Sequence, residues 1–499
     1  MSKKNFYITT AIDYPNGAPH MGHAYEKIIT DAYARWARSS GLETYFLTGT
    51  DENGQKLAKS AEELNVPTRK FVDDNAEIFK KLCSELKISN DDFIRTTESR
   101  HSKVVGEFWR KLEKNGDVYF DRYSGLYCLA CETFYTETQA SDRLCPEHKT
   151  KLELLEEEGY FFKMSKYEKW IKEFLTGNPA FVAPSEARNE IVSRLNSEPL
   201  KDLSISRPNK GWGIPVPGND KFVVYTWFDA LINYYSAVVG TSHENYWPAD
   251  LHVIGKDIGW FHTVIWPIML HALGIPTPAQ VYIHGMVLSE DGRKMSKSLG
   301  NGVDPFDVLK TYPLDSFRYF MLRSIPSGGN GRFSMKDLNQ RHVSELGNDF
   351  GNLLMRIVKL ARKRLGDQVA PVNLVANTNV NFDFEKVHLE MDRLMSAREH
   401  NRALDVLWSD LNKVNAYVNA STPWAIKDGD PQFQAVVHQT LQALYCASIL
   451  LAPFMPHTSA EALRSLGFKD EDFSKINRKN VSSLTFQLSD PPVLFPRVA

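Results

Sequence analysis

The first part of the chain alternates between two hydrophobic patterns. The runs "NFYITTAI" (5–12) and "ETYFLTGTD" (43–51) are rich in β-branched and aromatic residues, which predicts strands. Residues 22–38, 52–65 and 68–86 repeat apolar positions at three- and four-residue spacing, which predicts helices. The alternation predicts an α/β domain.

Near residue 117 the pattern changes to short strands, turns and cysteines, and it continues so to about residue 220. From "FVVYTWFDAL" onward α/β alternation resumes, with a helix to about 239, a strand "LHVIG", a helix from about Trp260 and a strand "VYIHGMVL". A single parallel-sheet domain interrupted by an insertion explains this order.

After about residue 340 apolar residues keep helical spacing as far as "ALRSLGF", which predicts a helical bundle. We therefore divide the chain into two halves of an α/β domain (1–116 and 222–290), an insertion (117–221), a linking region (291–345) and a helical domain (346–499).

Composition narrows the class of protein. Of the 499 residues 42% are hydrophobic, and the net charge of −2 gives no general nucleic-acid signature. The N-terminus lacks the apolar segment of a signal peptide, and we find no apolar run of membrane-spanning length. Five cysteines without a secretory signal argue against a disulfide framework. We expect a cytoplasmic enzyme.

Four potential metal ligands lie in "YCLACETF" and "RLCPEHKT", namely Cys128, Cys131, Cys145 and His148. Two knuckle half-sites supply three thiolates and one imidazole, a set that favours tetrahedral zinc. Since four protein ligands leave no open position, the zinc is expected to be structural.

The stretch "APHMGHAY" (18–25) places His20 and His23 around Gly22 at a predicted helix start. Backbone N–H groups and the helix dipole attract anions there. Taken alone, the stretch fits surface histidines in a capping turn equally well.

The stretch "GRKMSKSLGN" (292–301) predicts a loop with two ammonium groups, Lys294 and Lys297. Such groups can neutralise the charge that builds on a polyphosphate during nucleotidyl transfer. A lone pair of lysines at this spacing is more often a solvated loop.

Together "HMGH" and "KMSKS" resemble the two signatures of class I aminoacyl-tRNA synthetases. With "TGTDENG" (48–54), "WFDALINY" (227–234) and "GKDIGWFH" (255–262), the chain resembles the methionyl-tRNA synthetase family, in the subgroup with one Cys3His zinc knuckle. The resemblance implies a Rossmann-type catalytic domain split by a zinc-knuckle insertion and followed by an α-helical anticodon-binding domain. Leu231 replaces a proline common in relatives, Met21 an aliphatic residue, and Asn53 a frequent histidine.

The resemblance also implies how ATP and its Mg²⁺ are bound. His20 and His23 would donate to the phosphates, and Gly22 would admit the adenine. Lys294 and Lys297 would hold the departing pyrophosphate. Asp257 would bind ribose hydroxyls, with close approach at Gly255.

For the amino acid, the resemblance implies that Asp51 binds the substrate ammonium. Eight further positions match those lining the thioether cavity: Ile12, Tyr14, Trp227, Ala230, Leu231, Tyr234, Ile258 and His262. Apolar and aromatic walls suit a polarizable sulfur, and a Tyr or His hydrogen is expected to meet its weak acceptor.

The helical domain offers candidate RNA contacts. "TPWAIK" predicts a helix start with Thr422 as N-cap and Trp424 in the first turn, and Asn352 and Arg356 share one helical face. The resemblance implies that these positions, Asn352, Arg356 and Trp424, read a CAU anticodon. Without it, a half-buried tryptophan and a solvated arginine are the simpler interpretation. The cluster 362–364, "RKR", is expected to contact phosphates.

The leading hypothesis is an ATP-dependent ligase that charges initiator and elongator tRNA(Met) with methionine. A class I synthetase for another apolar amino acid, a non-catalytic RNA-binding protein derived from a synthetase, and a small adenylyltransferase are the alternatives. No extra oligonucleotide-binding barrel follows the bundle, so we expect a monomer.

Overall fold

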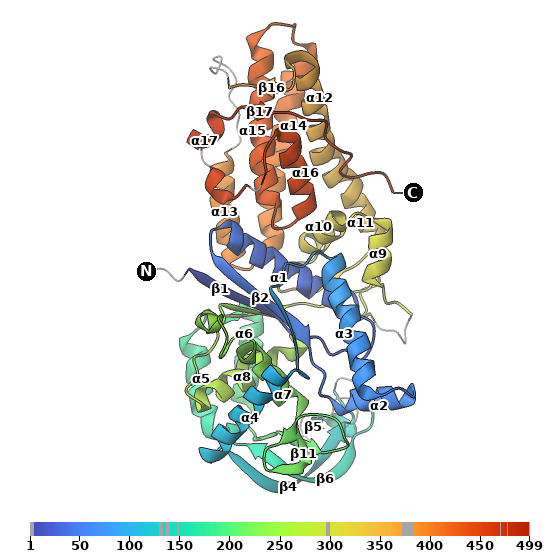
Figure 1. Ribbon diagram of the computed structural model, residues 1–499, viewed down its shortest axis with the longest axis vertical. Coiled ribbons are helices and arrows are strands. Elements are labelled where there is room, and N and C mark those ends of the chain that lie inside the picture. The colour runs from blue at the N-terminus through green and yellow to red at the C-terminus, as the bar shows by residue number, and fades with distance from the viewer. Residues whose placement is uncertain are drawn as a thin grey trace.

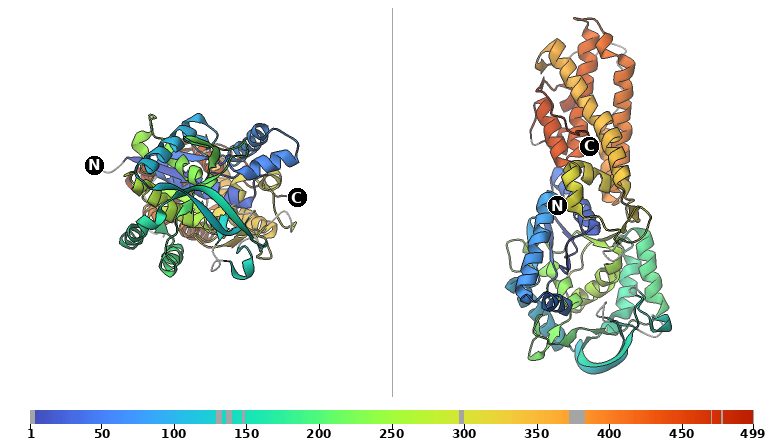
Figure 2. Two further views of the ribbon diagram at one scale, coloured as in Figure 1. Left: turned by 90° about the horizontal axis from the view of Figure 1, so that it is seen from below. Right: turned by 90° about the vertical axis from the view of Figure 1, so that its right-hand side faces the viewer.

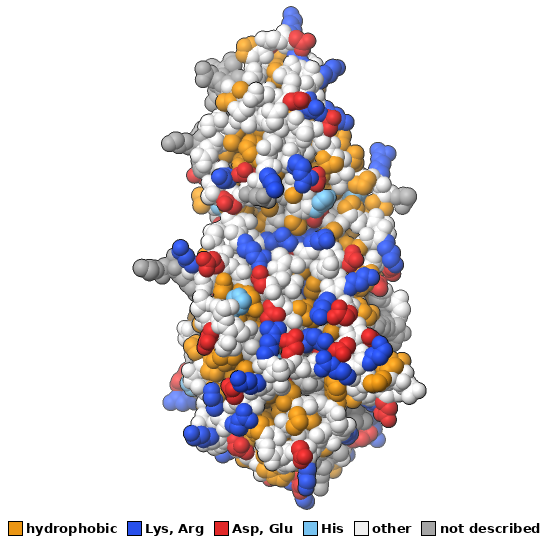
Figure 3. All heavy atoms as spheres, viewed as in Figure 1, with side chains coloured by type: hydrophobic (Ala, Val, Ile, Leu, Met, Phe, Trp, Pro, Cys, Tyr) orange, Lys and Arg blue, Asp and Glu red, His pale blue; other side chains and the backbone are white. Residues whose placement is uncertain are grey.

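The computed structural model describes residues 4–128, 133–135, 140–146, 149–295, 300–371, 383–469, 471–476 and 478–498. The molecule is elongated, with a helical bundle at one end, a parallel sheet in the middle and an antiparallel insertion at the other end (Figures 1 and 2). Basic and acidic side chains intermingle on the face shown in Figure 3, as the net charge of −2 leads one to expect.

Six strands of the described chain form the central sheet, in the order β3–β2–β1–β12–β13–β7, and all are parallel. Their bounds are β1 Asn5–Thr10, β2 Glu43–Thr50, β3 Asp92–Arg95, β7 Val182–Ala183, β12 Leu251–Gly255 and β13 Val281–His284. Strand order reverses between β1 and β12. In open α/β sheets the crevice beyond the carboxyl ends at such a point binds ligands.

Alternate residues of each strand enter two separate cores, because successive side chains point to opposite faces. Ile8 and Phe46 pack with α1 (Met21–Ser39) and with the bundle. Tyr7 and Leu47 pack with α4 (Ser99–Lys114), α7 (Thr226–Ser236) and α8 (Trp266–Ala272). A sheet covered on both faces needs apolar residues throughout, which explains the hydrophobic runs.

The insertion has more regular structure than its sequence predicts. β4 (Val118–Cys128) and β6 (Glu153–Phe162) form a long antiparallel pair, flanked by β5 (Thr133–Tyr135) and β8 (Leu203–Ser204). Two helices follow β6, α5 (Glu168–Gly177) and α6 (Ser185–Ser197), and β7 between them joins the central sheet. α6 was overlooked because it buries only Ile191 and Leu195. The three-stranded sheet β9 Ser206–Pro208, β10 Pro215–Val216 and β11 Asn219–Val224 completes this region.

The predicted helical bundle is confirmed. It contains α10 Leu314–Ser324, α11 Met335–Arg341, α12 Asn352–Leu365, α13 Phe384–Ser396, α14 His400–Ser421, α15 Pro431–Leu451, α16 Pro456–Leu466 and α17 Arg478–Ser482, with a π-helical stretch His342–Gly351 before α12. A small pair of strands, β16 (Gln368–Val369) and β17 (Phe486–Gln487), lies beside the bundle.

The remaining α-helices and strands lie outside the bundle and the sheets described above. They are α2 Gln55–Glu63, α3 Thr68–Glu85, α9 Pro305–Thr311, β14 Val287–Leu288 and β15 Gly331–Arg332. Among the described residues, no helix combines the length and apolar character needed to cross a bilayer.

The predicted helix start at "TPWAIK" is wrong. Thr422 adopts φ 41°, ψ 56° and ends α14, and a single 3-10 turn, Pro423–Ala425, follows it. The next helix begins at Pro431, where the Asp430 side chain accepts the Gln432 N–H. The N-cap residue followed by proline is therefore Asp430–Pro431, eight residues after Thr422–Pro423. Trp424 lies in a loop between two helices.

A buried ion pair joins the sheet domain to the bundle. Arg318 of α10 lies 2.7 Å (Nη2) from Oδ2 of Asp31 on α1, and both side chains are fully buried. Arg318 also donates to the carbonyls of Phe454, Pro453 and Leu86. Burial alone would raise the pKa of Asp31, but Arg318 and Arg35 outweigh burial and hold that pKa below its ordinary value.

We expect Arg318→Met to lower the free energy of unfolding by about 3–5 kcal/mol, because Asp31 would be left as a buried charge without its main partner. Since the folded-state pKa of Asp31 is depressed, the pair stabilises the protein above the ordinary carboxyl pKa. That contribution is lost as pH falls through the folded-state value. Urea denaturation at pH 7, and at pH values from about 4 down to about 2, measures both effects. Arg35→Met, which removes a partly exposed partner of Asp31, is the control and should cost about 1 kcal/mol or less. Equal losses in the two variants would contradict this account.

Candidate active site

A cavity of about 230 Å³ opens at the carboxyl ends of β1 and β12. All nine residues predicted for the amino-acid pocket line it: Ile12, Tyr14, Asp51, Trp227, Ala230, Leu231, Tyr234, Ile258 and His262. They come from the segments after β1 and β2, from α7 and from the region after β12. Residues far apart in the sequence thus converge at the point where strand order reverses, as the parallel sheet requires.

The walls of this cavity are mainly apolar and aromatic. The Trp227 ring stacks on Phe261 with centroids 4.1 Å apart, and Leu231 lies within the continuous helix α7. A proline at that position would lack the N–H that an interior helical residue donates, so leucine suits a regular helix.

Tyr234 and His262 form a hydrogen-bonded pair in the wall. His262 Nδ1 lies 3.0 Å from the carbonyl oxygen of Ile258, which can only accept, so Nδ1 carries the proton. Nε2 therefore accepts the Tyr234 hydroxyl proton at 2.7 Å. The Tyr234 hydroxyl proton and the His262 Nδ1 proton are thus both donated to acceptors within the cavity wall. This differs from our expectation that one of these protons meets the substrate sulfur. Burial lowers the pKa of His262 to about 4, so the ring is neutral at pH 7.

The two histidines of "HMGH" cap helix α1. His20 is the N-cap residue, and its Nδ1 accepts the Gly22 N–H at 3.1 Å, while His23 Nδ1 accepts the His20 N–H at 3.0 Å. The rings stack with centroids 3.7 Å apart. Because each Nδ1 is an acceptor, each ring carries its proton on Nε2. A Cβ at Gly22 would lie 2.9 Å from His20 Cε1, so this close pairing requires glycine.

Burial, with smaller contributions from His20 and the buried cation Lys27, keeps His23 neutral by lowering its pKa. Lys27, one turn along α1, pairs with Asp13 at 2.5 Å, and Asp13 Oδ1 lies 3.9 Å from His23 Nε2. Burial alone would lower the pKa of Lys27, but Asp13 raises it, so Lys27 stays charged. Burial, His20 and Lys27 together lower the pKa of His23 well below its ordinary value. The cap therefore presents neutral N–H donors at a helix N-terminus, which suits anionic oxygens.

The remaining nucleotide candidates follow strands of two different sheets, β12 and β14. Asp257 is exposed just after β12, and a Cβ on Gly255 would come within 2.8 Å of its Oδ1. Lys294 is exposed on a loop that folds back on Leu288 of β14. Lys297 lies outside the described residues.

Two of the four predicted metal ligands are described. Cys128, at the end of β4, and Cys145 are buried in one small cluster with Leu126, Ala140 and Leu152. Cys131 and His148 lie outside the described residues. Among the residues that are described, no group of three potential ligands gathers. Two further buried thiols, Cys83 in α3 and Cys446 in α15, lie in helices.

The three candidate anticodon residues lie near one another in the bundle. Asn352 and Arg356 are on the first turns of α12, and the Arg356 guanidinium lies 5.3 Å from the centroid of the Trp424 ring. Trp424 is 49% exposed, a large value for tryptophan. This cluster fits a platform for an unpaired base.

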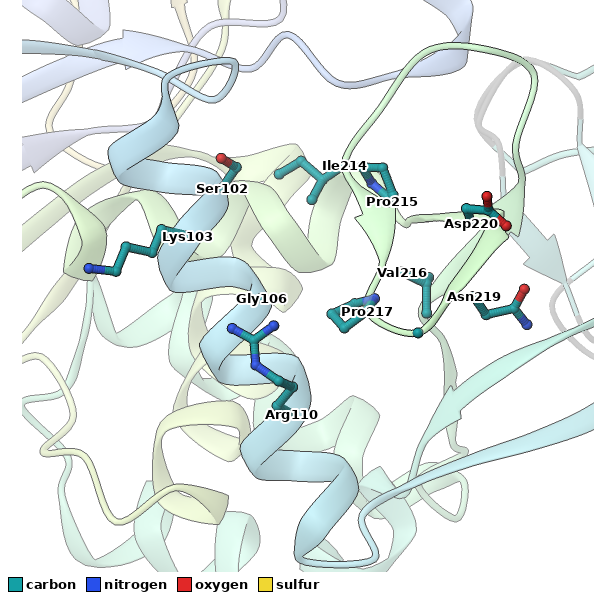
Figure 4. A pocket seen from close by; sticks show the side chains of 11 residues that line it. Ser102, Lys103, Gly106, Arg110, Ile214, Pro215, Val216, Pro217, Asn219 and Asp220 are labelled. Atoms are coloured by element: carbon teal, nitrogen blue, oxygen red, sulfur yellow. The ribbon is translucent and has the colours of Figure 1, made fainter.

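A second, larger cavity of about 580 Å³ lies apart from these residues, between α4 and the β10–β11 hairpin (Figure 4). Lys103 and Arg110 of α4 line one side and residues 214–220 the other. None of the candidate site residues lines it.

One charged residue of the first cavity was missed by sequence reasoning. Lys56, at the start of α2, lines the cavity together with Asp51. It lies two residues after the stretch "TGTDENG" (48–54), so its position five residues after Asp51 was the available signal.

Comparisons with known proteins agree with this geometry. A family model described as "tRNA synthetases class I (M)" matches residues 6–154 and 148–358, so the fold and site define a class I aminoacyl-tRNA synthetase. A second model, "Anticodon binding domain of methionyl tRNA ligase", matches residues 368–499. The chain belongs to the methionine–tRNA ligase family.

Individual relatives span nearly the whole chain. The methionine–tRNA ligase of Bacillus subtilis is 40% identical over 99% of this chain and 78% of its own length. That of Brucella suis is 39% identical over 100% of this chain and 98% of its own. The structure of Mycobacterium tuberculosis methionyl-tRNA synthetase in complex with methionyl-adenylate superposes with a TM-score of 0.92 at 36% identity, covering 99% of this chain and 100% of that one.

The neutral state of His262 leads to a pH prediction. Its folded-state pKa of about 4 lies below the ordinary value of about 6.5, so between these values the unfolded chain binds a proton that the folded chain does not. Stability from this group is present above about pH 6.5 and is lost as pH falls toward 4.

We expect His262→Gln to reduce the slope of unfolding free energy against pH by up to about 1.4 kcal/mol per unit in that window. Chemical denaturation at half-unit pH steps measures the slope. The wild-type protein, measured in the same series, gives the reference slope. An unaltered slope in the His262 variant would show that folding does not lower the pKa of this ring.

Proposed function

We propose that this protein activates methionine with ATP and transfers it to the 3′-terminal adenosine of initiator and elongator tRNA(Met). The observation that carries the proposal is the cavity whose lining contains all nine candidate amino-acid residues, beside a helix capped by two neutral histidines. Family membership supports the same reaction. The cytoplasm is the expected place of action, and a monomer the expected state.

At the amino-acid end, Asp51 would accept the substrate ammonium, and the thioether would lie against the Trp227 ring and the aliphatic walls. Sulfur–aromatic contacts stabilise such an arrangement by about 0.3–1.5 kcal/mol. Lys56 brings positive charge to the same cavity, which suits a carboxylate or a phosphate.

At the nucleotide end, a methionine carboxylate oxygen would attack the α-phosphorus of ATP, and the bond to pyrophosphate would break. His20 and His23 would donate from Nε2 to phosphate oxygens, while Lys294 and Lys297 would neutralise the leaving pyrophosphate. Asp257 would accept from ribose hydroxyls. Mg²⁺, bound with ATP, would add further charge neutralisation. In the second step a hydroxyl of the terminal adenosine would attack the methionyl carbonyl and release AMP.

At the far end of the molecule, Asn352, Arg356 and Trp424 would contact the anticodon. Because methionine and ATP are the only reactants of the first step, we expect activation to proceed without tRNA. With the domain division proposed from the sequence, the two steps belong to 1–290 together with Lys294 and Lys297 of the linking region, and the recognition of tRNA belongs to 346–499.

The proposal is tested by ATP–pyrophosphate exchange measured with each amino acid in turn. We expect methionine to support rapid exchange, with leucine and isoleucine far weaker, because the aromatic wall that includes Trp227 favours a polarizable sulfur. Strong exchange with leucine or isoleucine but not methionine would favour a synthetase for another apolar amino acid. Absence of exchange with every amino acid would favour a non-catalytic protein.

Two substitutions at His23 separate its roles in capping and in donation. An Asn side chain reaches the Nδ1 position of the histidine, whereas Gln reaches the Nε2 position. Because Nδ1 accepts the cap hydrogen bond, His23→Asn should keep more of the thermal stability. His23→Gln should keep more of the exchange rate, since Nε2 is the donor.

His23→Ala is expected to slow exchange by about 10²–10³. Methionine binding without ATP, followed by calorimetry, should change little in all three variants. If Asn preserved the rate better than Gln, the assignment of Nε2 as the donor would be wrong.

We propose that Cys128, Cys131, Cys145 and His148 hold one structural zinc. Support comes from the two described thiols, which are buried in one cluster although they belong to separate knuckles. Zinc would close the end of the insertion, where the small cluster buries few apolar residues.

Purified protein should contain about one zinc per chain by elemental analysis. Cys145→Ser should lose the metal and make the insertion sensitive to proteolysis, because metal binding and folding are coupled at such sites. Cys83→Ser and Cys446→Ser, at buried helical thiols, should keep it. Full zinc content in the Cys145 variant would refute the site.

A further inference from the structure

The loop that carries Trp424 has little structure of its own. It runs from Thr422, which is in the left-handed region, through one 3-10 turn to Asp430, where α15 is capped. Within the turn, Ala425 N–H donates to Thr422 O at 2.8 Å. Such a short turn fixes the conformation of only a few residues. The exposed Trp424 ring therefore needs contacts from other segments to hold the loop in place.

That support comes from Arg364, one residue before the end of α12. Its Nη1 donates to the Pro423 carbonyl at 3.1 Å and its Nη2 to the Ile426 carbonyl at 2.8 Å. The two carbonyls flank Trp424 in sequence. One guanidinium therefore fixes the loop on both sides of the exposed ring.

The guanidinium is itself held in place. It lies over the Phe433 ring, 3.8 Å from the centroid, and its side chain is only 13% exposed. Its Nε lies 2.6 Å from Oδ1 of Asp428, but this carboxylate is 91% exposed, so that ion pair adds little. The two carbonyl bonds and the stacking are the contacts that define the geometry.

This arrangement differs from the phosphate role expected for the basic cluster 362–364. Arg364 is engaged with the loop, and Arg362 pairs with Asp367 at 2.7 Å and with Asp490. These two arginines serve the protein's own structure, although their sequence resembles a patch for phosphates.

We propose that Arg364 is a positioning residue that presents Trp424 to tRNA. The inference rests on the proposed role of Trp424 in reading the anticodon. Helix α12 then organises the whole cluster, because its first turns supply Asn352 and Arg356 and its last turn fixes the loop that carries the tryptophan. Lysine cannot replace this arginine, since a single ammonium lacks the planar fork that reaches two carbonyls and stacks on a ring.

The test is a double-mutant cycle between Arg364→Lys and Trp424→Ala, read as kcat/KM for tRNA(Met) in aminoacylation. A lost base stack is expected to lower kcat/KM by roughly 5- to 150-fold in Trp424→Ala. Arg364→Lys, which keeps the charge, should lower it by roughly 3- to 30-fold. The double variant should be no worse than Trp424→Ala, within about 2-fold, because Arg364 acts through the ring.

Three controls separate positioning from other roles. ATP–pyrophosphate exchange should keep its wild-type rate in Arg364→Lys, which excludes general misfolding. Arg362→Lys, a conservative change two residues away on the same helix, should stay within about 2-fold of wild type. The slope of log kcat/KM against log salt should be unchanged in Arg364→Gln, which removes the charge, whereas loss of a phosphate contact would reduce it by about 1.

Several results would overturn the proposal. A wild-type kcat/KM in Arg364→Lys, with Trp424→Ala impaired, would refute the positioning role and leave anticodon reading by Trp424 intact. Additive effects in the double variant would show that Arg364 acts independently of the ring. No effect of Trp424→Ala would refute the proposed anticodon role of Trp424 itself. Loss of exchange in Arg364→Lys would assign Arg364 to the fold as a whole.

Discussion

The buried ion pair between Asp31 and Arg318 attaches helix α1 of the sheet domain to the helical bundle. The N-terminus of α1 carries the histidine cap beside the cavity, and its middle is held against the bundle by a guanidinium that also binds carbonyls of the α15–α16 connection. Removing two charges from water is costly, so the pair is tolerated only because the carbonyls and Ser89 satisfy the remaining hydrogen-bonding capacity. The consequence is that one helix contacts both the cavity region and the bundle.

Around the cavity, hydrogen bonds determine which nitrogen of each imidazole holds the proton. Backbone N–H groups donate to Nδ1 of His20 and His23, so both rings keep the proton on Nε2, whereas the Ile258 carbonyl keeps the proton of His262 on Nδ1. His20 and His23 therefore present N–H donors that suit an anion. The protons of His262 and Tyr234 are instead donated to acceptors within the cavity wall. Burial lowers the pKa of His23 and His262, which keeps both rings neutral at pH 7.

Much of this fold could be predicted because the spacing of apolar residues along the chain indicates which side chains are buried. The strand "LHVIG" matches β12 in full, and α1 begins within one residue of its predicted start. α6 was missed because few of its residues are buried, and Thr422 was read as an N-cap because its left-handed conformation has no local signature. The cavity-lining residues were found through motifs of the family, and spacing alone would not have grouped them.

Contacts between distant segments were beyond sequence reasoning. Asp31 and Arg318 are single charges in helical patterns, and nothing near either one indicates its partner. Arg364 resembled a phosphate ligand because its carbonyl partners lie in a loop about sixty residues later. Such pairs depend on how whole helices pack, which one-dimensional patterns do not contain.

The central claim is that one cavity selects methionine while a separate cluster selects the tRNA. Its most direct test is to incubate the protein with ATP, all twenty amino acids and unfractionated tRNA, and then to identify every aminoacyl-tRNA formed. The account predicts methionine alone, attached to tRNAs with a CAU anticodon. Methionine on tRNAs regardless of anticodon, or any other amino acid as the main product, would contradict it.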